Sequence, residues 1–183
     1  MTGIISDNVA RTSGLIKASG GGGAWNLIKS QTASSSSSIS FVHGTSDVVL
    51  DSTYPIYLFQ FINIHPATDS VDFQFNLSTD SGSNYNVTKT TTFFRSFHFE
   101  DASAANVQYQ TNEDLAQSTG YANLSDRVDN DADSSCSGTL FIFSPSNTTF
   151  MKHFTATFNR AFGDDPVTAN DFVGGYGNTT SAV

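Results

Sequence analysis

The chain has 183 residues, a formal net charge of −9, and 8 Lys and Arg against 17 Asp and Glu. This length fits one domain with a single core. The eight basic residues are spread singly and form no patch that would neutralise a nucleic-acid backbone, so we expect no nucleic-acid partner.

Residues 1–24 differ in character from the rest. Their aliphatic side chains are spaced irregularly among Ser, Thr, Asn and Gly, and the segment ends in four consecutive glycines at positions 20–23. We interpret it as an N-terminal arm that docks on a partner through Ile4, Ile5, Leu15 and Ile16. The alternative is a frayed terminus.

Beyond the arm, runs in which every second residue is apolar predict β-strands, because successive side chains leave a strand on opposite faces. Residues 56–65, bracketed by Pro55 and Pro66, are apolar on both faces and are expected to form a central, doubly covered strand. Residues 71–79 and 86–99 are expected to form a hairpin around a turn at 80–85. The other predicted strands are residues 25–32, 39–42, 138–143 and 150–162.

The alternation also predicts which side chains face the core. The side chains expected inside stand at the alternate, apolar positions of their strands, and they are Phe73, Phe75, Phe154 and Phe158. Asp72 and Gln74 stand at the intervening positions, which point to the other face of the strand, and are expected at the surface.

These patterns predict an all-β fold, an antiparallel two-sheet sandwich of jelly-roll type with an extended N-terminal arm. The arm comprises residues 1–24 and the sandwich residues 25–183. Residues 100–137 are expected to be irregular, with a helical turn within 113–124.

An acidic segment in that irregular part is a candidate metal site. Asp129, Asp131 and Asp133 stand at alternate positions, and carboxylates so spaced can surround Ca²⁺. The segment lacks the Gly and Glu that an EF-hand loop requires at its sixth and twelfth positions. The alternative is a solvated acidic loop, and we expect no other cofactor.

No other motif predicts catalysis. Residues 78–85 resemble the Asp-box turn of sialidase-like propellers, which in that family is a folding element. The four histidines lack zinc spacing, no nucleophile elbow occurs, and we expect no enzymatic activity. Cys136, the only cysteine, is expected to be a small buried residue without a disulfide. We expect neither a signal peptide nor a membrane span.

Several sequence segments resemble those of small structural proteins of marine tailed bacteriophages, and the resemblance covers nearly the whole chain. It rests on residues 3–8 and 13–17, the block at 63–69, the segment 85–90 and the end of the chain at 175–182. Proteins of this group continue past the Ser-Ala pair at 181–182, which implies that this chain is shortened or that its sandwich lacks an edge.

The resemblance implies a virion protein assembled in the host cytoplasm, without a catalytic residue. We expect capsid decoration or a head fibre, anchored by the arm to the major capsid protein or a neighbouring virion subunit, and a homo-oligomer. The alternative is a tail-fibre or adhesin module that binds a host-surface glycan.

Overall fold

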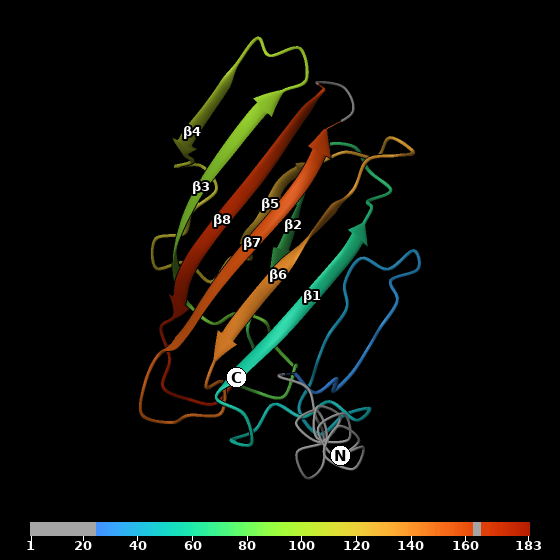
Figure 1. Ribbon diagram of the computed structural model, residues 1–183. Helices are drawn as coiled ribbons and strands as arrows, with labels where there is room; N and C mark the ends of the chain where they lie inside the picture. Colours follow the sequence, from blue (N-terminus) through green and yellow to red (C-terminus); the bar gives the residue numbers. More distant parts are fainter. Residues whose placement is uncertain (1–24, 163–165) are drawn as a thin grey trace, which may run out of the picture.

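A computed structural model describes residues 25–162 and 166–183, and these residues form an all-β structure without a helix (Figure 1). The predicted arm, with Ile4, Ile5, Leu15 and Ile16, lies outside the described residues. The strands are β1 (Ile56–Ile64), β2 (Val71–Phe75), β3 (Lys89–Phe99), β4 (Ala105–Tyr109), β5 (Ala122–Val128), β6 (Cys136–Phe143), β7 (Lys152–Phe162) and β8 (Val167–Gly177).

The eight strands form two antiparallel sheets of unequal size, which confirms the predicted sandwich. The larger sheet has six strands in the order β1-β6-β7-β8-β3-β4, and the smaller pairs β2 with β5. In Figure 1 the small sheet lies behind the middle of the large one, and β5 contacts β7, β8 and β3. The jelly-roll part of the prediction is not confirmed by this strand order.

The core lies between the two sheets. Phe154 and Phe158 of β7 are 1% and 0% exposed, as the alternation predicted. Phe73 and Phe75 of β2 are half-buried, and their rings pack on the rings of Phe158 and Phe154 at centroid distances of 5.7 and 4.8 Å. Asp72 and Gln74 are exposed, so the predicted register of β2 is confirmed.

The structure corrects the prediction for the segment before β1. Residues 25–32 and 39–42 form no strand, and the segment instead packs aromatic rings against the large sheet. The Trp25 ring lies 6.1 Å from that of Phe141, and the Phe41 ring lies 5.4 Å from that of Phe59. Strand β1 is therefore an edge strand and not the central one predicted.

The predicted hairpin of residues 71–79 and 86–99 is also wrong. Strand β2 pairs with β5, whereas β3 pairs with β8 and β4 in the other sheet. The turn between them has the predicted form: Asp80 Oδ1 accepts the Asn84 backbone N–H at 2.8 Å, and Gly82 has a left-handed φ of 79°. The turn therefore carries the chain from one sheet to the other.

The segment predicted to be irregular contains two strands. Residues 105–109 form β4 and residues 122–128 form β5, and the expected helical turn is absent from the described residues. Strand β5 was missed because Asn123, Ser125 and Asp126 are polar and yet buried. Alternation of apolar residues cannot reveal a strand whose inward side chains are polar.

Candidate functional site

The large sheet directs all of its charged side chains inward. Its six strands contain Lys89, Arg95, Lys152, Arg160 and Asp171 and no other Lys, Arg, Asp or Glu. Four of these residues are at most 2% exposed, and the side chain of Arg95 is 15% exposed. This arrangement reverses the usual preference of charged residues for the surface, so the sheet has a charged inner face and an uncharged outer face.

The inward charges of β3, β7 and β8 meet Asp126 of β5 in a buried ion cluster. Asp126 Oδ1 accepts from Arg160 Nη2 at 2.6 Å, and Asp126 Oδ2 accepts from Arg95 Nη1 at 2.6 Å. Arg160 Nε lies 3.4 Å from Asp171 Oδ2, which also accepts from the Ser125 hydroxyl at 2.8 Å. Each of these contacts except the Arg160–Asp171 pair connects the two sheets, so the cluster holds the small sheet on the large one.

Burial changes how these groups ionise. Burial raises the pKa of Asp171 to about 6, although the Arg160 guanidinium opposes the shift. Asp171 Oδ1 is buried without a hydrogen-bond partner among the described residues. Burial also raises the pKa of the Cys136 thiol to about 12. Cys136 is fully buried and free, as predicted, and it is a packing residue rather than a nucleophile.

Two buried lysines lie at the end of the large sheet. Lys89 and Lys152 both pair with Gly177, so their side chains leave the same face of the sheet. Lys89 Nζ donates to Asn76 Oδ1 at 2.5 Å and to the Val87 carbonyl at 2.7 Å, and burial lowers its pKa to about 8. Lys152 Nζ donates to the Phe150 carbonyl at 2.7 Å. Oxygen dipoles of loops thus satisfy both ammonium groups.

The three aspartates proposed for calcium do not come together with other ligands. Asp129 is 1% exposed, whereas Asp131 and Asp133 are exposed. Asp129 Oδ1 accepts the backbone N–H of Asp131 at 3.1 Å, which is a turn contact. Across residues 25–162 and 166–183 no group of three His, Cys, Asp or Glu side chains is arranged to hold a metal ion. Calcium binding at these positions stays a prediction.

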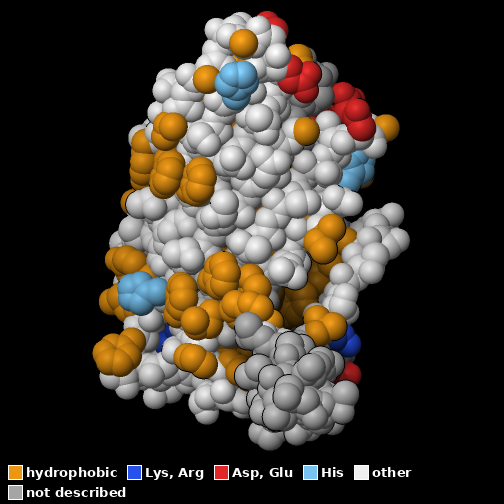
Figure 2. Space-filling view, in the orientation of Figure 1, with side chains coloured by type: hydrophobic (Ala, Val, Ile, Leu, Met, Phe, Trp, Pro, Cys, Tyr) orange, Lys and Arg blue, Asp and Glu red, His pale blue; other side chains and the backbone are white. Residues whose placement is uncertain are grey.

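The outer face of the large sheet is the most extensive candidate site. Cross-strand pairing places only uncharged residues and two histidines on it, and its centre is rich in Thr, Asn and Ser. Figure 2 looks onto this face and shows white and orange side chains over the sheet, with acidic side chains at its upper rim. The outward aromatic residues are Phe94, Tyr109, Phe141, Phe143, Phe172 and Tyr176.

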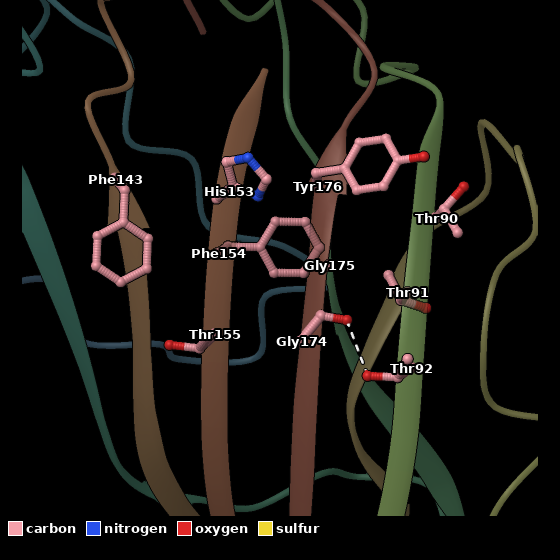
Figure 3. Close-up of a pocket in the computed structure, with 10 residues that line it drawn as sticks. All are labelled: Thr90, Thr91, Thr92, Phe143, His153, Phe154, Thr155, Gly174, Gly175 and Tyr176. Atoms are coloured by element: carbon pink, nitrogen blue, oxygen red, sulfur yellow. Dashed lines mark hydrogen bonds between the residues drawn. The ribbon is translucent and has the colours of Figure 1, made fainter. Parts of the chain in front are cut away.

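Two features give this face local structure. The Phe94 and Phe172 rings stack across neighbouring strands with centroids 5.0 Å apart and an interplanar angle of 11°. Elsewhere, Gly174 leaves an open hollow of about 360 Å³. Figure 3 shows Phe143, His153 and Tyr176 around this hollow, with Thr92 and Thr155 beside it. The Thr92 hydroxyl donates to the Gly174 carbonyl at 3.3 Å.

The chain matches no known protein family, and no curated protein and no solved structure is detectably similar to it. The described residues include no helix long and apolar enough to cross a membrane.

Sequence reasoning missed both the ion cluster and the uncharged face. A signal was present in β7, where Lys152 and Arg160 share the parity of Phe154 and Phe158. A charged residue on the apolar parity of a strand indicates a buried charge. The partners of Arg160 could not be predicted in this way. Asp126 and Asp171 lie on β5 and β8, and the sequence did not predict that these strands contact β7.

Proposed function

We propose that the protein is a non-enzymatic structural protein of a tailed-phage particle. It is displayed on the particle surface as capsid decoration or a head fibre, and residues 1–24 anchor it to the major capsid protein or a neighbouring subunit. The main support is the outer face of the large sheet, which is uncharged and bears aromatic residues. The centres of protein interfaces are likewise depleted of charge and enriched in aromatic residues. The resemblance of several sequence segments to bacteriophage structural proteins supports a place in the virion.

The position of the ionisable groups supports a structural role. Arg95, Arg160, Asp126 and Asp171 form the ion cluster, and they pair with one another between the sheets. Groups so enclosed are occupied by one another and do not face a substrate. The outer face offers hydroxyl, amide and aromatic groups, which suit adhesion.

Particles with and without residues 1–20 test the proposal. We expect immunogold labelling or cryo-electron microscopy to find the full chain over the capsid surface. Deletion of residues 1–20 should leave the melting temperature of the isolated protein almost unchanged and abolish its incorporation. Labelling confined to the tail tip, or normal incorporation of the truncated chain, would contradict the proposal.

The hollow at Gly174 favours a second candidate function, the binding of a neutral host-surface glycan in a tail-fibre or adhesin module. Tyr176 and His153, whose ring centroids lie 6.1 Å apart, offer aromatic faces to a sugar ring, and Thr92 and Thr155 offer hydroxyls. Small-ligand sites commonly combine an apolar surface with a few polar groups in this way.

A glycan array tests this second function. Replacing Tyr176 by Ala should abolish any binding observed, whereas Tyr121→Ala, which removes an exposed ring outside the large sheet, should preserve it. Absence of binding by the unaltered chain, or equal binding by both variants, would exclude the hollow as a glycan site.

A further inference from the structure

The large sheet exposes one of its two faces without a single Lys, Arg, Asp or Glu, in a chain whose net charge is −9. Solvated sheet faces usually carry charged side chains, because these keep the sheet soluble and prevent association. On this face the stacked rings of Phe94 and Phe172 remain accessible, and the Phe94 residue is 41% exposed. A face of this composition resembles the centre of an interface.

We propose that two copies of this chain associate face to face through the outer face of their six-stranded sheets. This inference concerns the isolated protein in solution and goes beyond the virion role proposed above. It assigns the surface through which the protein forms a homo-oligomer.

The net charge limits where a second copy can bind. Two molecules that each carry a charge of −9 repel one another, so a stable contact between them must exclude the acidic side chains. The outer face is the part of the described sheet where that condition holds, and Figure 2 shows the acidic groups at its rim. A basic partner would instead be expected to select an acidic surface.

The face is close in size to what a stable dimer needs. Six strands of 5 to 11 residues span roughly 900 Å² at the usual strand spacing and rise, and the Trp25 ring occupies part of this area beside Phe141. Standard interfaces bury about 800 Å² on each partner.

The chemistry of the face suits pairing with itself. Thr139, Thr155 and Thr157 lie side by side near its centre, since Thr157 pairs with Thr139 and Thr155 is two residues away on β7. Hydroxyl groups both donate and accept hydrogen bonds, so an identical surface satisfies them. A two-fold axis places each residue opposite its counterpart or opposite a residue that contacts it reciprocally.

Analytical ultracentrifugation of three proteins tests the proposal. Thr157→Lys places a charge at the centre of the face, and Thr79→Lys places the same charge on an exposed residue outside the sheet. Both substitutions change the net charge equally, so bulk repulsion is matched. We expect the unaltered chain and Thr79→Lys to sediment with twice the chain mass of 19.6 kDa, and Thr157→Lys to sediment as a folded monomer with a cooperative unfolding transition.

A second variant covers the case in which Thr157→Lys fails to fold. Phe94→Ala removes a partly exposed ring without adding a charge and should weaken dimerisation measurably. A full-length chain that stays monomeric from micromolar to submillimolar concentration would overturn the proposal, even if that monomer binds a glycan or another protein. A folded Thr157→Lys protein that remains dimeric would overturn it as well.

Discussion

Asp126 is the side chain on which two arginines depend. Both of its carboxylate oxygens are used, one by Arg160 and one by Arg95, and its own side chain is 3% exposed. Removing one partner of a buried ion pair leaves the other charge in a low-dielectric environment without compensation.

We expect Asp126→Asn to destabilise the protein by about 3 to 5 kcal/mol, because Arg95 loses its carboxylate and Arg160 keeps only the more distant one of Asp171. Urea denaturation followed by circular dichroism measures this change. Asp133→Asn is the matched control: Asp133 is exposed, so its replacement should change the unfolding free energy by less than about 0.5 kcal/mol. Similar midpoints for the two variants would show that Asp126 does not support the arginines.

Asp171 gives a prediction for pH. Its pKa is raised to about 6 in the folded chain from an ordinary value of 3.8. Between these values the folded state binds a proton that the unfolded state has released, so the contribution of Asp171 to stability falls as pH rises through this window. Surface groups such as Asp80, whose hydrogen bonds lower its pKa to about 2, act in the opposite direction.

The comparison that isolates Asp171 uses Asp171→Asn, which keeps the shape of the side chain. The stability of the unaltered chain minus that of Asp171→Asn should decrease as pH rises from 4 to 6. Urea midpoints at several pH values measure it. A difference that is flat or that increases over this window would contradict the assignment.

At the scale of elements, the close packing of β8 depends on Gly175. A Cβ atom built there would lie 2.6 Å from the Thr90 carbonyl oxygen and 2.9 Å from Phe154 Cζ. The neighbouring Gly174 faces outward, and a Cβ atom there would meet nothing closer than Thr92 Oγ1 at 3.6 Å. Two adjacent glycines of one strand therefore have different roles.

We expect Gly175→Ala to destabilise the protein by roughly 1 to 3 kcal/mol, because the added methyl group forces β8 away from β3 or displaces Phe154. Gly174→Ala adds the same methyl group toward solvent and should have little effect on folding. Thermal unfolding of the two variants provides the measurement. Equal melting temperatures would mean that β8 and β3 do not approach so closely.

Five of the eight strands, β1, β2, β3, β6 and β7, could be predicted from sequence. Strands β4, β5 and β8 were not predicted, and residues 25–32 and 39–42, which were expected to be strands, form none. Alternation in β2 and β7 gave the correct inward residues, since burial on one face imposes a period of two. Strand partners could not be predicted in the same way. Residues 71–79 and 86–99 are close in sequence and joined by a well-formed turn, yet they belong to different sheets. A turn sequence determines local geometry, and the partner of each strand depends on packing distant in sequence.

The candidate site was less predictable than the fold. Finding the outer face required the pairing of six strands, because its residues come from positions 56 to 176. The ion cluster likewise draws on β3, β5, β7 and β8. The calcium hypothesis relied on neighbours in sequence alone, and the structure does not gather Asp129, Asp131 and Asp133 into a ligand set.

At the scale of the whole molecule, the charges of the large sheet lie inside the sandwich and its uncharged side chains lie outside. The inner arginines and aspartates pair with one another, and the two lysines donate hydrogen bonds to loop oxygens. The pairs link the large sheet to a second sheet of only two strands. The outer face is then free of charge and suited to contact another protein surface. Burial of the charged residues is thus the central claim, and the proposed interface depends on it.

Reductive methylation of lysines in the native protein, followed by peptide mass spectrometry, tests this claim most directly. Lys89 and Lys152 are 0% exposed, whereas Lys29 is only partly buried. We expect Lys29 to be methylated rapidly, Lys89 and Lys152 to stay unmodified in the folded chain, and all three to react equally after unfolding in urea. Methylation of Lys89 and Lys152 in the folded chain at the rate of Lys29 would contradict the account.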